Sequence, residues 1–255
     1  MSDKTSDAKT VKLPLLYKEL TPLSHSRHGD YGVAATRSFE FARELKFVPL
    51  TMDEFPQAQR DYPIVFTSKG PTVPVALLGS NEGGNQFVEA DGSWRKGAYV
   101  PGYLRRYPFQ MVREKEGSDR HIFCADLTCD LFEKDCKDEE RRLFDGEKPG
   151  KASERAMEFC KNYEAALART RKAIEELETL KLIDESSVSL KSGEQTSKID
   201  GFAVVDEKKL RELSDATISS LVKRGVMGCV YAHLFSMSNF ARLAMKQPAA
   251  EASGV

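Results

Sequence analysis

Apolar residues recur at alternating spacings of four and three over one long stretch, and this pattern constrains the fold more than any other. The seam consists of Ala156, Cys160, Tyr163, Leu167, Thr170, Ile174 and Leu177. Because residues three and four apart share one face of an α-helix, the spacing predicts a long amphipathic helix that begins near Ser153. Such a seam can pair with a second helix in a dimer or pack on its own domain, and we expect the second arrangement.

The chain before this helix shows short strands and turns instead. Runs rich in β-branched and aromatic residues lie at 62–66, 73–79 and 121–125. Asp91-Gly92 between two apolar runs predicts a β-hairpin, because glycine tolerates the positive φ of a tight turn. Thr51 and Glu54 have the spacing of a capping box and predict a short helix that begins at Met52. We therefore expect an α+β fold, with an N-terminal, mostly antiparallel β-sheet region followed by C-terminal helices.

Turn residues at Asp145-Gly146 and Pro149-Gly150 mark a change of composition. They separate a β-rich region, residues 13–146, from a helix-rich region, residues 151–246, and the two form either separate domains or one continuous domain. The polar ends, residues 1–10 and 247–255, are expected to be disordered. Residues 186–198 are expected to form a polar loop or an edge hairpin.

Helix signals also mark the C-terminal part of the chain. Asp206 starts a short helix, Ser214 caps another, and Gly225 ends that helix. A last helix is expected from Val226 to Met245, and it carries His233 on its apolar face. We expect this histidine to be hydrogen-bonded in the core rather than to act as a catalytic base.

Length and composition bound the function. The 255 residues can bury a full core, and 38 basic against 39 acidic residues give no electrostatic argument for nucleic acid or an anionic membrane as a partner. The polar start and the lack of a long apolar run predict a cytoplasmic protein with no membrane-spanning segment. The five cysteines are an odd number, which fits reduced thiols better than a disulfide framework.

The segment Trp94 to Phe109, WRKGAYVPGYLRRYPF, is the densest in aromatic, proline and arginine residues. Its prolines lack a backbone donor, so it is expected to be an irregular or short helical crossing rather than a central strand. The candidate binding residues, which together form the patch discussed below, are Trp94, Tyr103, Arg105, Arg106 and Tyr107. The arginines could hold a carboxylate or phosphate while a tyrosine stacks on a guanidinium. Alternatively the aromatic residues form core and the arginines form internal ion pairs.

Signals for catalysis or metal binding are weaker. His25 and His28 lie in a predicted loop and are the candidates for acid/base chemistry. His121 and the cysteines after it, Cys124, Cys129 and Cys136, are residue types that bind zinc, but a paired CxxC is lacking. The acidic residues from 126 to 140 lack the EF-hand pattern, and the glycines near 80 fit no nucleotide loop. We expect no metal and no cofactor.

Several ordered segments carry a family resemblance. They are Glu54-Phe55 with 62–66, PVALLG at 74–79, NQFV at 85–88 with DGSW at 91–94, YVPGYLRRYPF at 99–109, residues 201–210, and YAHL at 231–234 with Ser238-Asn239. On these residues the chain resembles the bacterial SapC family over most of residues 13–243. The resemblance implies association with the paracrystalline bacterial surface layer and a structural or accessory role at the cell envelope. It implies no catalytic residues.

These observations leave several hypotheses for the function. The first is a non-enzymatic, surface-layer-associated accessory, structural or binding protein, whose partners are envelope or surface-layer components. The second is a cytoplasmic small-molecule-binding protein or enzyme, which uses the arginine and tyrosine patch for an anionic small molecule and His25 or His28 as the acid/base. A metal-dependent site at His121 is the third. The oligomeric state stays open.

Overall fold

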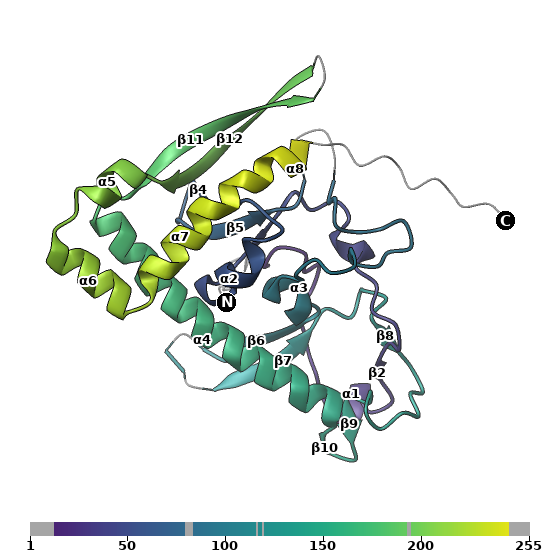
Figure 1. The fold of residues 1–255 in the computed structure, drawn as a ribbon. Coiled ribbons are helices and arrows are strands. Elements are labelled where there is room, and N and C mark those ends of the chain that lie inside the picture. Colours follow the sequence, from purple (N-terminus) through teal and green to yellow (C-terminus); the bar gives the residue numbers. More distant parts are fainter. Residues whose placement is uncertain (1–12, 80–83, 116, 119, 193–194, 245–255) are drawn as a thin grey trace, which may run out of the picture. The chain divides into compact units, whose positions relative to one another are not determined.

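The computed structural model describes residues 13–79, 84–115, 117–118, 120–192 and 195–244 (Figure 1). The two expected disordered tails, at 1–10 and 247–255, lie outside this range. The chain forms two compact units, each built from two segments. Unit 1 combines the residues up to 34 with 108–154, and unit 2 combines 35–107 with the residues from 155 onward. The units therefore do not follow a single cut in the chain, and each is treated by itself below.

The fold is α+β, as the sequence predicts. Every strand pair between the described strands is antiparallel. The longer helices follow residue 150.

Unit 1 contains three small sheets. In the three-stranded sheet, of order β1-β7-β6, the strands are Thr21–Pro22, His121–Ala125 and Phe109–Arg113. The two-stranded sheets pair β2 (Gly32–Val33) with β8 (Phe132–Glu133) and β9 (Phe144–Asp145) with β10 (Lys148–Pro149). The Phe109 ring stacks on Phe123 at 5.3 Å and meets Phe132 edge-on at 5.6 Å. This aromatic cluster holds the middle of the unit together.

Unit 2 is built on a five-stranded sheet. Its order is β11-β12-β4-β5-β3, with strands Ile183–Ser192, Gln195–Val205, Ile64–Thr67, Pro74–Leu77 and Phe47–Pro49. Strand β12 pairs with β4 through Phe202 and Ala203, and the rest of the β11–β12 hairpin extends beyond the sheet (Figure 1). Of the two predicted forms for residues 186–198, the edge hairpin is confirmed for the described residues, with strands longer than expected.

The helices and 3-10 turns of unit 2 begin at most of the predicted caps, but the single last helix expected from Val226 to Met245 is interrupted by a 3-10 turn in its described part. They are η1 (Glu40–Ala42), η2 (Met52–Glu54), α2 (Phe55–Ala58), α3 (Gly102–Arg106), α5 (Glu207–Arg211), α6 (Asp215–Lys223), α7 (Val226–Ser236), η3 (Met237–Asn239) and α8 (Phe240–Ala244). The caps at Asp206 and Ser214 form, and Gly225 ends α6 with a φ of 75°. The turn at Gly92 also forms, although the expected hairpin is reduced to one bridge between Val88 and Trp94.

Helix α4, Lys151–Thr179, begins in unit 1 and continues in unit 2. The predicted seam is confirmed in its main part, since Cys160, Tyr163, Thr170, Ile174 and Leu177 are buried. The seam packs within the chain itself. Thr170 illustrates this, because its hydroxyl accepts a hydrogen bond from the backbone N–H of Met52 at 2.9 Å.

Helix α7 lies against the sheet (Figure 1), and a histidine of this helix replaces a backbone hydrogen bond between two strands. The register of β4 and β12 would place Ile64 opposite Val205. Instead, His233 Nε2 accepts from the Val205 N–H at 3.0 Å, and Nδ1 lies 2.7 Å from the Ile64 carbonyl oxygen. Because the Val205 N–H can only donate, Nδ1 carries the proton and donates to Ile64.

The imidazole therefore bridges two strands in its neutral form. His233 is fully buried, and burial lowers the pKa of its imidazole to about 4. Ser236, one helical turn later, accepts from the Ile64 N–H at 2.9 Å, so α7 satisfies both backbone groups of that strand residue. The expectation of a hydrogen-bonded core histidine is confirmed, and the helix is fixed to the sheet by buried polar contacts as well as by packing.

Candidate functional site

Tyr99 is the centre of the segment that the sequence singled out. Its backbone N–H donates to the Asp61 carboxylate at 2.9 Å. Its carbonyl oxygen accepts from the Tyr62 hydroxyl and, at 3.2 Å, from the Trp94 indole N–H. Its hydroxyl lies 3.0 Å from a carboxylate oxygen of Glu54. Because the N–H, carbonyl and hydroxyl groups of Tyr99 all form hydrogen bonds, this residue fixes the chain just before the crossing from Pro101 to Pro108.

Glu54 is the buried anion that positions helix α3. One carboxylate oxygen accepts from the Tyr99 hydroxyl and from the Gly102 N–H, at 3.0 and 2.6 Å. The other oxygen accepts from the backbone N–H and the hydroxyl of Thr51, at 2.8 and 3.0 Å. The predicted capping box is thus confirmed. The same carboxylate also caps α3, so two helix starts share one side chain.

The close approach at Gly102 requires a glycine. A Cβ atom at this position would lie 3.1 Å from Glu54 Oε1 and 3.1 Å from the Tyr163 ring. The glycine lets the backbone of α3 reach the carboxylate without displacing the tyrosine.

Arg106 is buried between two aromatic rings. Its guanidinium carbon lies 4.9 Å from the Tyr103 ring centre and 4.8 Å from that of Tyr163. Its Nη1 forms an ion pair with Glu164 at 3.2 Å, and only 4% of the arginine side chain is exposed. Burial raises the pKa of Tyr103 to about 12, so both phenols stay neutral beside the cation. This arginine serves the internal packing that the sequence analysis gave as its alternative.

The other aromatic residues of the predicted patch are also buried. Trp94 stacks on Phe87 at 5.9 Å, and the Tyr107 ring lies 4.5 Å from that of Phe41. Arg37 Nη2 closes the end of α3, where it lies 2.7 Å from the carbonyl oxygens of Leu104 and Tyr107. The structure therefore brings the patch residues together in unit 2, but four of the five are buried.

Arg105 is the exposed member of the patch, and its side chain is held in place. Nη2 donates to the Tyr99 hydroxyl at 2.9 Å. The guanidinium carbon lies 5.5 Å from the Tyr99 ring centre and 5.2 Å from that of Phe159. Among the residues that the structure describes, no carboxylate forms an ion pair with it. The result is an oriented cation on an exposed side chain.

A hydrogen-bonded chain links this surface cation to the buried anion. Arg105 donates to the Tyr99 oxygen, and the Tyr99 hydroxyl donates to Glu54. Burial, followed by the Glu54 charge, raises the pKa of Tyr99 to about 12. The tyrosine therefore stays protonated near neutral pH and keeps its direction of donation. This chain orients a charge, and it offers no group poised to exchange a proton at neutral pH.

The two predicted acid/base histidines lie in unit 1, on the single-turn helix α1 (His25–His28) rather than in a loop. His28 is buried, and its Nδ1 accepts from the Ser24 N–H at 3.2 Å. Burial, followed by the charge of Arg27, lowers the pKa of His28. His25 is exposed and meets the Phe144 ring edge-on at 6.1 Å. In the described part of unit 1, neither histidine forms a side-chain hydrogen bond with a carboxylate.

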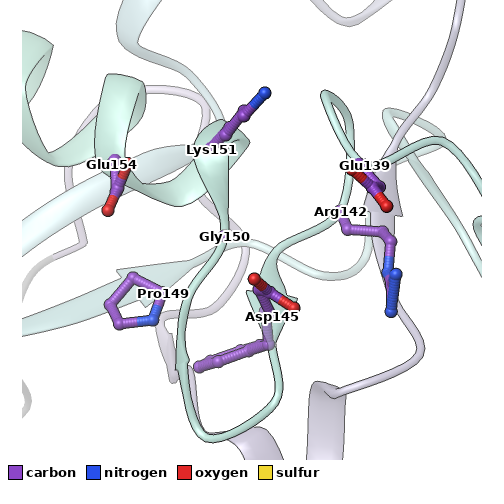
Figure 2. A pocket seen from close by; sticks show the side chains of 8 residues that line it. Glu139, Arg142, Asp145, Pro149, Gly150, Lys151 and Glu154 are labelled. Atoms are coloured by element: carbon purple, nitrogen blue, oxygen red, sulfur yellow. The ribbon is translucent and has the colours of Figure 1, made fainter.

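A small cavity in unit 1 lies at the start of α4. Figure 2 shows its lining, which comprises Glu139, Arg142, Phe144, Asp145, Pro149, Gly150, Lys151 and Glu154. Its volume is about 210 Å³. Drug-sized ligands usually occupy pockets of about 300–1,000 Å³, so this cavity is small. Its lining carries three carboxylates and two cations. The cavity therefore favours neither a large ligand nor one sign of charge.

A larger cavity of about 440 Å³ in unit 2 is lined by α4, η2 and the start of α7. Its main cations are already paired, Arg169 with Asp53 and Arg224 with Glu176. Cys229 also lines it, but burial and the Asp53 charge raise the pKa of that thiol. A protonated thiol is a weak nucleophile, so this cavity offers no reactive group.

Metal ligands do not gather in the described part of the chain. No group of three or more His, Cys, Asp or Glu side chains there could hold a metal ion. None of the five cysteines, all of which lie in the described part of the chain, forms a disulfide. Burial raises the pKa of Cys160 to about 11 and also raises those of Cys124 and Cys136.

Sequence reasoning missed three residues that build this site, namely Glu54, Tyr99 and Phe159. Glu54 was assigned to its own helix, and its second role depends on a contact 48 residues away. Tyr99 belonged to the predicted segment, but nothing in its spacing marked it as the centre. Phe159 lies beside the helical seam, where a half-buried aromatic residue has no separate signal.

Comparison with known protein families identifies a profile that matches most of the chain. The profile of the family described as SapC matches residues 23–243, which include every described strand except β1 and the whole of the candidate site. No curated protein and no solved structure is found to match the chain. None of the described helices combines the length and apolar character that a membrane-spanning segment needs. Because the profile covers most of the sequence, the chain belongs to the SapC family.

Proposed function

We propose that this protein is a non-enzymatic accessory binding protein of the bacterial surface-layer system, and that it recognises an anionic group through Arg105. The observation that carries the proposal is the exposed guanidinium, which is oriented by Tyr99 and Phe159 and forms no ion pair with any described carboxylate. The surface-layer part rests on the association that the family resemblance implies.

An arginine held in this way suits a carboxylate or a phosphate. The planar fork can donate two parallel hydrogen bonds to either group, and its aromatic neighbours reduce the entropy lost on binding. The absence of a paired carboxylate among the described residues means that a ligand need not displace an internal partner. These features support binding, and no described histidine or thiol near Arg105 supports a reaction.

The experiment is cosedimentation of the purified protein with the cell-envelope fraction of its own bacterium. Arg105→Ala should weaken binding about 10- to 150-fold, since a charge-assisted hydrogen bond contributes about 1.5–3 kcal/mol. Arg171→Ala, which removes an exposed arginine from α4, is the matched control and should bind like the wild type. Equal binding by all three proteins would contradict the role of Arg105.

Inorganic phosphate and acetate as competitors separate the two kinds of ligand. If the protein binds envelope material and the competitors release it, the anionic group belongs to an envelope component. If the protein binds the small anions and ignores the envelope fraction, it is a small-molecule-binding protein, and the surface-layer role is wrong.

We also propose that the protein performs this accessory role from the reducing interior of the cell, rather than as a part of the external layer. Five described cysteines that form no disulfide, three of them buried, support this location, because cysteines in oxidising compartments usually pair. Cell fractionation with protease treatment of intact cells should leave the protein undigested, and a thiol count on the native protein should find all five reduced. Digestion on intact cells would place it on the surface instead.

A further inference from the structure

Helix α7 and the 3-10 turn η3 that follows it carry an exposed, uncharged stripe on the face opposite the sheet. The stripe consists of Gly228, Tyr231, Phe235 and Ser238, all of them exposed. Phe235 is 67% exposed and Tyr231 is 43% exposed, although both are large aromatic residues. Their rings stack at 6.0 Å with an angle of 27°. A preformed, solvent-facing aromatic pair on a helix is typical of an interaction surface.

The glycine in this stripe is a second, independent observation. Gly228 lies inside the helix, where glycine is among the least favourable residues. A Cβ atom built on it would meet nothing within 4 Å, so no contact within the described chain requires a glycine there. A glycine on an exposed helix face does, however, permit the close approach of another element from outside.

We propose that a second copy of this chain packs on the stripe, with the two α7 helices antiparallel. Gly228 and Phe235 lie at nearly equal distances on either side of Tyr231. In a twofold arrangement the Phe235 ring of each copy covers the Gly228 of the other, and the two Tyr231 side chains flank the symmetry axis. The stripe is therefore self-complementary, as an isologous interface must be.

Charge also favours a second copy over an oppositely charged partner. The four residues of the stripe carry no charge, so two copies meet there without repulsion and without an unpaired buried ion. A single helix face buries less than the ~1,200 Å² of a standard stable interface. The dimer is accordingly weak and forms at high protein concentration.

Sedimentation velocity over about 5 µM to 1 mM tests this proposal, a range that covers weak association. The wild type should shift from monomer to dimer with concentration, and Phe235→Ser should lower the association constant at least tenfold. Val222→Ser is the matched control, since it removes another exposed apolar residue, 56% exposed, on α6. It should associate like the wild type.

Gly228→Ala separates dimerisation from folding. Alanine improves the helix and should raise the Tm of the monomer by about 2–4 °C. The added methyl group fills the space that Phe235 needs, so the same variant should dimerise more weakly. A wild type that stays monomeric at every concentration would overturn the proposal, and so would equal association by the Phe235 and Val222 variants.

Discussion

Replacement of His233 by leucine is expected to lower the free energy of unfolding by about 2–6 kcal/mol, because two buried backbone groups lose their partners at once. The imidazole donates to the Ile64 carbonyl and accepts from the Val205 N–H. Leucine does neither, so the Ile64 carbonyl and the Val205 N–H both lose the hydrogen bond that the imidazole provides. Urea unfolding followed by circular dichroism measures the loss.

His233→Gln tests the hydrogen-bonding explanation. Glutamine offers one donor and one acceptor, so this variant should recover part of the stability that leucine loses. His25→Leu, at an exposed histidine, is the matched control and should change stability by less than about 0.5 kcal/mol. Equal losses in the leucine and glutamine variants would mean that packing, rather than hydrogen bonding, explains the effect.

The same contact makes stability depend on pH. The pKa of His233 is about 4 in the folded protein, below the ordinary value of 6.5. The unfolded chain therefore binds more protons between pH 6.5 and 4, and this contribution to stability is complete above pH 6.5. It is lost as the pH falls through 4, at up to about 1.4 kcal/mol per pH unit. The slope should be smaller in His233→Leu.

Replacement of Glu54 by glutamine is the second large effect that we expect. Each carboxylate oxygen accepts two hydrogen bonds, so four N–H or O–H groups donate to this side chain. An amide puts an NH₂ group against one pair of donors, and the Thr51 N–H cannot turn away. We expect a loss of about 2–4 kcal/mol, measured by urea unfolding.

Hydrogen exchange locates the damage in the Glu54 variant. If the carboxylate positions α3, the Gly102 amide should exchange faster in Glu54→Gln, while the amides of α7 keep their protection. Glu175→Gln changes an exposed glutamate of α4 and serves as the control, with an effect below about 0.5 kcal/mol. An unchanged Gly102 amide would show that the carboxylate does not hold this helix.

Local signals in the sequence predicted local structure well. The capping box at Thr51, the cap at Ser214, the glycine at 225 and the seam of α4 all act through neighbours within a few residues. Such features depend on backbone geometry that a short stretch determines by itself. The mixed fold class followed from the same signals.

Contacts between distant segments could not be predicted from the sequence. Glu54 reaches Gly102, and His233 reaches Ile64 across 169 residues. The burial of Arg106 depends on a tyrosine from α4, which no local pattern connects to Arg106. The sequence therefore identified the segment from Trp94 to Phe109 as a candidate site. Only the tertiary structure shows that Arg105 is exposed while the other four candidate residues are buried.

The measurement that tests the anion-binding account most directly is an NMR titration of the arginine side chains with inorganic phosphate. The Nε–H signal of Arg105 should shift and saturate, whereas that of Arg171 should change little and without saturation. Arg105→Lys keeps the charge but loses the planar fork, and it should bind phosphate more weakly. If the Arg105 signal follows that of Arg171 throughout the titration, this arginine is an ordinary surface cation and the proposed recognition site does not exist.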